Sequence, residues 1–318
     1  MDPAWRPLFS LILVSALIIH DEWVSTPSCE TQTLLPTSNL DDSESESMED
    51  HSEDLRVMLV ADLLLLGSDS GFLNRIFTDY YTSKFFRKSF QSLGPDVLVV
   101  LGDVSARGSE LTKSKWLSVL HQFHGVLGPF LELPLHVVLG DRDVGCCSEL
   151  SAKSVNWIAG RFPGLDSAGC GSFEIGNVSF VSLNAVALLC GNNDLRFGVE
   201  RWRETEFPLG LVPSFCFIFH CAKHRPHTPV GDSKSNLIDG RGFVGAGPYS
   251  LMQNLPANAT EYIFQALKPR IVFSAHSHKF STYAHPDGTY EVAVPAMTWN
   301  ARDDPGFIVA ISGRTEEQ

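Results

Sequence analysis

Positive charge is scarce in this chain of 318 residues, which carries 24 Lys and Arg against 37 Asp and Glu. Residues 41–54, "DDSESESMEDHSED", contribute eight of these acids and no Lys or Arg. Because this stretch has little apolar surface to bury, we expect residues 26–54 to be a disordered acidic linker. The remainder is only mildly acidic and has no basic stripe, so nucleic acid is excluded as a partner.

Long hydrophobic runs are also missing. The N-terminal run "LFSLILVSALII", Leu8–Ile19, has only 12 residues without a charge and follows Arg6. A run this short is typical of a signal-peptide core, or of an uncleaved signal anchor lengthened by Trp23. The best small-x-small cleavage match, Val14-Ser15-Ala16, lies inside the run, which favours an anchor over residues 1–25. Both alternatives predict a lumenal body, with the anchor giving a single-pass membrane protein.

Cysteine is limited to seven residues, none of them spaced as the Cys-x-x-Cys pair of a zinc finger. In a secretory compartment they are compatible with disulfides, but their connectivity cannot be deduced from the sequence. Two glycosylation tripeptides, at Asn177 and Asn258, agree with that compartment and predict a glycoprotein.

From residue 56 onward, short apolar runs alternate with longer amphipathic ones. The apolar runs 57–62, 95–103 and 133–141 predict strands, and residues 77–94 and 109–128 predict helices that end at glycine. Continuous apolar strands joined through helices indicate a parallel arrangement with both faces covered.

The C-terminal half favours further strands. Residues 171–188 read as a hairpin around Gly176-Asn177, and strands are predicted at 214–220, 270–276, 289–295 and 306–312. The expected fold is α/β, with two packed mixed β-sheets flanked by helices over residues 55–313 and a short tail at 314–318.

Acidic and histidine side chains follow the apolar runs at the points where strands end. An Asp after a strand can be a simple turn former or helix cap, but that explanation fits a whole series of such endings poorly. Parallel strands present their carboxyl ends along one edge, where open α/β sheets bind ligands. We therefore expect six side chains to meet at one rim: Asp62, Asp103, Asp141, His220, His276 and His278.

This mixture of carboxylates and imidazoles is typical of a site for a first-row divalent ion. The absence of cysteine from the set argues against structural zinc, and the histidines argue against an oxygen-only calcium cage. Two ions sharing Asp103 would bind a phosphate and prepare a water for in-line attack.

The order and spacing of these residues resemble the calcineurin-like metallophosphoesterases over residues 56–312. In that family the pattern is DxH, GD, GNH followed by an acid, a lone His, and GHxH. The ending "VPAMTWNARDDPGF", residues 294–307, and the N-terminal segment resemble the membrane-anchored branch. That branch includes the ER/Golgi enzyme that removes ethanolamine phosphate from GPI anchors, together with its plant relatives.

The resemblance implies an αββα sandwich, one or two divalent ions per chain, and a phosphoester substrate. Mn²⁺ is the expected ion, with Fe or Zn as alternatives, and a GPI glycolipid is the expected substrate. It also implies an endoplasmic reticulum or Golgi location. The resemblance assigns Asp62, Asp103 and His278 to the first ion. The second ion would take Asp103, Asp141, His220 and His276.

Four positions depart from the family pattern. Asp141 replaces an Asn and can still coordinate a metal, Ala275 replaces a Gly, and Leu64 and Arg142 each replace a His. Leu64 stands where the DxH motif has a ligand His, so the first ion loses a ligand. Arg142 stands where the family has a general-acid His, and a guanidinium does not give up its proton near pH 7. We expect Arg142 to clamp a phosphate oxygen and to pair with Asp143, and Asp143 to orient the site.

Two functions follow from these residues. One is a metal-dependent phosphodiesterase that acts in the ER or Golgi. The other is a catalytically weakened or silent relative that keeps the fold to bind a glycolipid or a protein. Leu64 and Arg142 favour the second, whereas the retained ligands, including Asp141 in place of Asn, favour the first.

Overall fold

The computed structural model describes residues 5–20, 54–128, 132–145, 149–189, 194–206, 215–218, 263–298, 301 and 305–312. The chain divides into two compact units, Met1–Asp50 and His51–Gln318. His220, Asn258 and almost all of the predicted acidic linker lie outside the described residues.

The first unit contains one helix, α1 (Trp5–Ile19), which covers the predicted signal-anchor run. Its described side chains, from Phe9 onward, are exposed. Within the described part of the chain, no helix has the length and apolar character needed to span a membrane.

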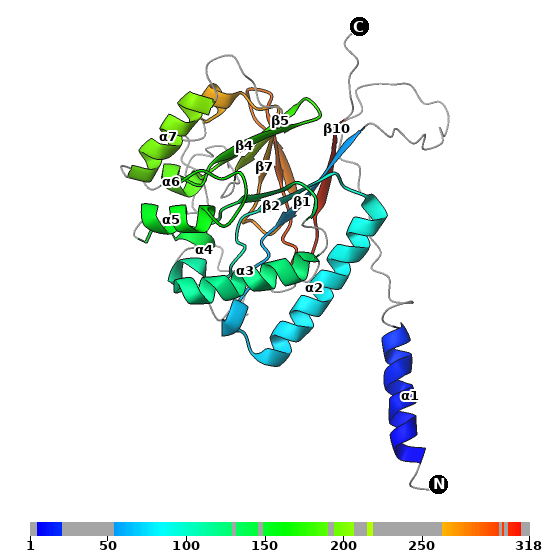
Figure 1. Cartoon of the computed structure of the whole chain (residues 1–318). Helices are drawn as coiled ribbons and strands as arrows, with labels where there is room; N and C mark the ends of the chain where they lie inside the picture. The colour runs from blue at the N-terminus through cyan, green and yellow to red at the C-terminus, as the bar shows by residue number, and fades with distance from the viewer. Residues whose placement is uncertain are drawn as a thin grey trace, which may run out of the picture. The chain divides into compact units, whose positions relative to one another are not determined.

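The second unit is built from two β-sheets (Figure 1). The smaller sheet has the order β10-β1-β2-β3, from β10 (Ile308–Ser312), β1 (Leu55–Ala61), β2 (Val97–Leu101) and β3 (Leu135–Val138). In it β1, β2 and β3 are parallel and β10 is antiparallel to β1. This sheet is therefore mixed, as the sequence predicts.

The larger sheet has the order β4-β5-β6-β7-β9-β8. It contains β4 (Gly171–Ile175), β5 (Val178–Leu183), β6 (Phe215–Ile218), β7 (Ile271–Ser274), β9 (Tyr290–Ala293) and β8 (Ser281–Ala284). The strands β5, β6, β7 and β9 run parallel, and the two edge strands are antiparallel. The predicted fold class, two packed mixed sheets flanked by helices, is confirmed.

Helices cover the outer faces of these sheets. The long helices α2 (Phe72–Leu93) and α3 (Lys113–Leu127) pack against each other (Figure 1). The chain also forms α4 (Asp141–Val144), α5 (Ala152–Ala159), α6 (Ala185–Leu189) and α7 (Asp194–Glu206). Two 3₁₀ turns, η2 (Gly67–Asp69) and η3 (Gly108–Glu110), precede α2 and α3. Helix α2 ends where Gly94 adopts a left-handed conformation and its N–H bonds to the carbonyl of Phe90.

Several sequence-based boundaries differ from the structure. Helix α3 begins at Lys113 rather than at residue 109, because Gly108–Glu110 form η3. Helix α2 begins at Phe72 rather than at residue 77, because exposed Phe72 and Ile76 blur the amphipathic pattern of its first turns. The predicted hairpin 171–188 is too long, because α6 starts at Ala185. The side chain of Asn184 accepts the N–H of Ala187 and so starts this helix in place of more strand.

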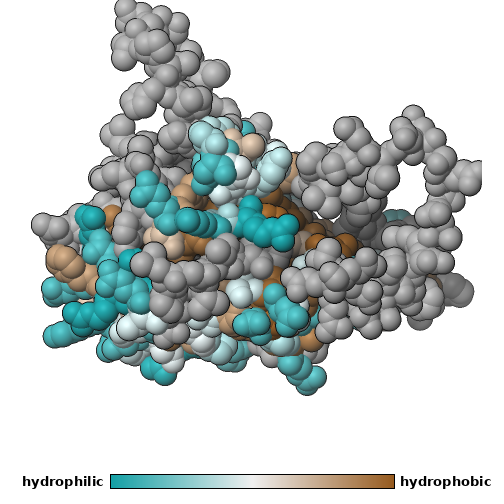
Figure 2. All heavy atoms as spheres, turned by 90° about the horizontal axis from the view of Figure 1, so that it is seen from above, coloured by the Kyte–Doolittle hydropathy of each residue, from teal (hydrophilic) through white to brown (hydrophobic). Residues whose placement is uncertain are grey.

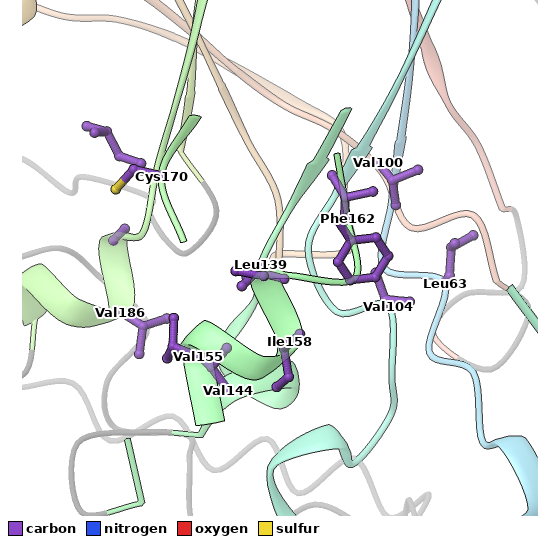
Figure 3. Close-up of a cluster of buried hydrophobic side chains, with 14 of the residues drawn as sticks. Leu63, Val100, Val104, Leu139, Val144, Val155, Ile158, Phe162, Cys170 and Val186 are labelled. Atoms are coloured by element: carbon purple, nitrogen blue, oxygen red, sulfur yellow. The ribbon is translucent and has the colours of Figure 1, made fainter. Parts of the chain in front are cut away.

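The strands alternate between two cores. Val57, Leu59 and Ala61 of β1 face the layer between the sheets, where Phe180 and Phe273 of the larger sheet also lie. The intervening side chains join a second cluster with residues of the covering helices. Figure 3 shows part of that cluster, with Val100, Val104 and Phe162 close together. Among the coloured residues of Figure 2, hydrophilic side chains lie beside hydrophobic ones that reach the surface between them.

One polar contact crosses between the sheets. His136 of β3, only 4% exposed, lies 2.7 Å through Nε2 from the Ser182 hydroxyl of β5. The His136 ring also packs on Phe173, with 4.8 Å between centroids. Burial lowers the pKa of His136 to about 4, so the ring is neutral in the folded protein at neutral pH.

Candidate metal centre

Three of the predicted side chains form one cluster at the carboxyl ends of the strands. Asp103 and Asp141 follow β2 and β3 of the smaller sheet, and His276 follows β7 of the larger one. One donor atom from each of the three lies within 4.8 Å of the others. We call these residues the carboxylate–imidazole trio.

A second pair lies beside this trio. Nδ1 of His278 is 3.0 Å from Oδ2 of Asp62, which follows β1 directly. The ring centroids of His276 and His278 are 6.1 Å apart. Five of the six predicted ligands therefore gather at one rim drawn from both sheets, while the sixth, His220, lies outside the described residues.

The segment after β9 connects the end of β1 with the loop that carries His278, through two backbone hydrogen bonds. The N–H of Met297 donates to the carbonyl of Ala61 at 2.9 Å, and the N–H of Ala296 donates to that of His278 at 3.3 Å. Ala296 and Met297, which are adjacent in the chain, therefore fix the His278 loop next to the end of β1. This arrangement keeps His278 beside Asp62. Ala296 and Met297 belong to the "VPAMTWN" stretch on which the resemblance to the membrane-anchored branch rests.

Four of the five described ligand positions share an uncommon backbone conformation. φ is positive at Asp62 (51°), Asp103 (39°), His276 (77°) and His278 (56°). Asp and His tolerate this left-handed region better than most residues do, and it turns each side chain out of its strand. Strained backbone of this kind concentrates at functional sites, so it supports a functional rim.

Leu64 shares this conformation, with φ at 50°, although a leucine gains nothing from it. Its N–H donates to the carbonyl of Asp103 at 2.9 Å, and its side chain is only 4% exposed. The backbone at position 64 therefore has a left-handed conformation that suits a polar residue, although its side chain is apolar and offers no metal ligand. The sequence showed the substitution but not this conformation.

The trio has an unfavourable charge balance without a cation. Burial, followed by the neighbouring charge of Asp141, raises the pKa of Asp103 well above its usual range. Nδ1 of His276 lies 3.3 Å from Asp141 Oδ1 and 3.6 Å from Asp103 Oδ2. Burial alone would lower the pKa of His276, but its contacts with Asp103 and Asp141 outweigh this and raise the pKa to about 10. In the absence of a metal ion, the proton on His276 supplies the positive charge beside the two carboxylates that a bound ion would otherwise supply.

These residues fit a divalent metal ion. Two carboxylates and an imidazole are a donor set that suits first-row ions. Asp62 is fully buried, and among the described residues its Oδ1 atom has no hydrogen-bond partner. Buried oxygens of this kind need a compensating charge or donor, which a cation supplies.

Arg142 contacts a different acid from the one expected. The sequence predicted a pair with Asp143, but Nε of Arg142 lies 3.3 Å from Oδ2 of Asp103. The backbone N–H of Arg142 also donates to Oδ1 of Asp103 at 3.1 Å. The Arg142–Asp143 pair was wrong, because Arg142 sits on the first turn of α4 facing the end of β2.

Asp143 instead binds backbone. Its carboxylate accepts the N–H groups of Val104 at 3.2 Å, Ser105 at 2.8 Å and Gly140 at 3.0 Å. These donors flank Asp103 and Asp141, so Asp143 joins the two loops that present the trio. Burial outweighs these hydrogen bonds and raises the pKa of Asp143 to about 7. Its position is that of an orienting residue.

The chain is similar to known phosphoesterases. No protein-family model matches it. Metallophosphoesterase 1 of Rattus norvegicus is 25% identical over 283 residues, which cover 80% of this chain and 68% of that protein. Metallophosphoesterase 1 of Danio rerio is 22% identical over 294 residues, covering 85% and 75%. A solved dimetal phosphatase from Danio rerio gives a TM-score of 0.44 at 13% identity, covering 80% of this chain and 91% of that one. The curated relatives support the metallophosphoesterase superfamily for this chain.

Proposed function

We propose that this protein is a metal-dependent phosphoesterase that hydrolyses phosphodiesters. The observation that carries the proposal is the trio of Asp103, Asp141 and His276, which places three metal-type donors within 4.8 Å of one another. Similarity to Metallophosphoesterase 1 over 80% of the chain supports the same chemistry. When bound, a divalent ion would polarise the phosphate and lower the pKa of a water.

The chain's own residues divide the remaining work. Asp103, Asp141 and His276 would hold the ion, with Mn²⁺ as the expected metal, and Asp62 and His278 would complete the rim. His276 must give up its proton to act as a ligand, so the ion and the proton compete. Asp143 positions the loops of Asp103 and Asp141 through three backbone N–H groups.

Arg142 is the residue suited to bind the substrate. Its Nε atom is occupied by Asp103, and its side chain is 36% exposed. Among the described residues, no hydrogen bond or ion pair engages its two terminal nitrogens. A guanidinium held at one nitrogen and open at two others can clamp a phosphate and stabilise its developing charge. It supplies no proton, so the leaving group departs unassisted or takes its proton from water.

The substrate and the compartment are further parts of the proposal. The "VPAMTWN" stretch and the N-terminal apolar run support a membrane-anchored lumenal enzyme of the ER or Golgi that removes ethanolamine phosphate from GPI anchors. The turn residue Asn177 is exposed between β4 and β5, which is compatible with glycosylation.

The test measures hydrolysis of bis(p-nitrophenyl) phosphate by the full chain with Mn²⁺ and after chelation. We expect turnover that needs the metal, that is lost in Asp103→Asn, and that falls about tenfold to a hundredfold in kcat/KM in Arg142→Ala. Arg142→Lys should recover part of the loss, because an ammonium cannot bind two oxygens in plane. An ethanolamine-phosphate mannoside, offered in parallel, tests the GPI substrate.

The alternative is a silent relative that binds a glycolipid or a protein. Buried Leu64 and the Arg142–Asp103 pair favour it, because both reduce the room for metal chemistry. Metal-loaded protein without any hydrolysis of the diester, but with retention of the mannoside on the protein, would establish this alternative in place of the enzyme.

A further inference from the structure

Arg142 contacts both oxygens of a single buried carboxylate, one through its backbone and the other through an ion pair of its side chain. Its backbone N–H reaches Oδ1 of Asp103 at 3.1 Å and its Nε reaches Oδ2 at 3.3 Å. Asp103 is fully buried, whereas the Arg142 side chain is 36% exposed. The guanidinium therefore brings a permanent positive charge to the carboxylate at the centre of the rim.

Among the described residues, the opposite half of the rim offers a second ion one open oxygen, Oδ1 of Asp62. Asp62 and His278 are already bonded to each other at 3.0 Å. The neighbouring Leu64 is buried and presents no donor atom, so a second ion would have to break that pair and gain nothing from Leu64. The trio around Asp141 keeps three donors that converge.

The charges of the rim also favour one divalent ion over two. The buried carboxylate of Asp143 is compensated by three backbone N–H groups and stays outside this count. Among the other described residues of the rim, Asp62, Asp103 and Asp141 carry three negative charges when ionised, and Arg142 supplies one fixed positive charge. One divalent ion among neutral imidazoles would then balance the pocket, whereas two would leave an excess of positive charge. Buried charge persists only where it is compensated, so the balanced arrangement is favoured.

We infer that the Arg142 guanidinium serves as a built-in cation for Asp103, so that this rim holds one divalent ion in the Asp103–Asp141–His276 trio. The inference rests on the proposed metal-dependent function and makes it more specific. Loss of a ligand at position 64 and gain of a cation at position 142 are then two halves of one change. Leu64 leaves a second ion without a donor at that position, and the Arg142 guanidinium supplies positive charge in place of that ion.

The test is metal stoichiometry and affinity, measured by titration calorimetry of the full chain with Mn²⁺ after chelation. The wild type should bind one ion. Arg142→Ala should bind that ion at least tenfold more tightly, because a competing charge has left Asp103. Leu64→His should add only a weak second ion. The double variant Leu64→His/Arg142→Ala should bind two, so that the two substitutions act together rather than additively.

Two controls separate charge from folding. Arg142→Lys should keep a stoichiometry of one, and Arg87→Ala, an exposed charge change on α2, should leave metal binding as in the wild type. If the double variant does not fold, Arg142→Gln in the wild-type background tests the charge effect alone: Mn²⁺ affinity should rise at least tenfold, and an unchanged affinity would overturn the inference.

The outcomes distinguish this inference from the proposed function. Two ions in the wild type, or unchanged affinity and stoichiometry on removing Arg142 in both backgrounds, would overturn the inference, even in an active phosphodiesterase. A chain that binds one ion and responds to Arg142 as expected, but hydrolyses no diester, would uphold it and overturn the proposed function.

Discussion

The buried contact between His136 and Ser182, which joins the two sheets, makes part of the stability of the fold depend on one imidazole. His136 of β3 is buried against Ser182 of β5, and burial lowers its pKa from 6.5 to about 4. Because the folded value is lower than the unfolded one, its stabilising contribution is complete above pH 6.5 and is lost as the pH falls through 4. The whole effect is about 3 kcal/mol, since one pKa unit corresponds to about 1.4 kcal/mol. By pH 5 about 2 kcal/mol of it has gone.

The assay is urea unfolding of the wild type and of His136→Gln at pH 7.5 and pH 5. Glutamine can keep a hydrogen bond to Ser182 but has no proton to gain over this range. Between the two pH values, the wild type should lose about 2 kcal/mol more than the variant. Every other titrating group is common to both proteins and cancels in the difference. Equal losses in the two proteins would show that His136 does not carry the acid sensitivity of the fold.

Three further perturbations test the rim and its supports. Mn²⁺ at a hundred times its Kd should stabilise the wild type by about 2.7 kcal/mol, seen as a raised Tm that chelation reverses, and should leave the Tm of Asp103→Asn unchanged. Asp143→Ala should weaken Mn²⁺ binding about tenfold to a hundredfold in calorimetry by releasing both ligand loops, whereas exposed Asp96→Ala should not. Gly171→Ala should destabilise the fold by about 1–3 kcal/mol in urea unfolding, since a Cβ there would meet backbone and the ring of His136. In Gly176→Ala, where the only cost is a positive φ, a loss of about 1 kcal/mol is expected; a larger loss there than at Gly171 would contradict the packing argument.

The sequence was most informative where strands end. The apolar runs that become β1, β2, β3 and β7 are continuous and buried, and each is followed within a few residues by an acid or a histidine. The apolar runs and the residues that follow them can both be recognised from local sequence. Because the strands are parallel within each sheet, these residues lie together at the carboxyl ends of the strands. For this reason Asp103, Asp141 and His276 could be grouped in advance, although they come from two sheets.

The sequence could not show contacts that depend on the directions of side chains between loops. Arg142 is next to Asp143 in the chain, yet it pairs with Asp103, 39 residues away, because α4 turns it toward β2. The left-handed backbone of Leu64 was equally hidden, since nothing in a leucine signals it. The strand β8 and the helix α6 were missed because each is short, with four and five residues, too few for a clear period. The helices α4, α5 and α7 were not predicted either.

The pairing of β1 with β10 has a consequence for how the protein is made. β1 opens the second unit, but its outer neighbour, β10, lies near the end of the chain, and Asp62 meets His278 across 216 positions. During synthesis, the outer edge of β1 therefore stays unpaired until Ile308–Ser312 have been made, whereas the rim needs the chain only as far as His278 and Met297. A chain interrupted before Ile308 would keep a row of unpaired N–H and C=O groups along β1 and would be prone to join other chains. Such a chain would hold every described ligand of the rim, so its association with other chains would report the missing strand and its metal binding would not.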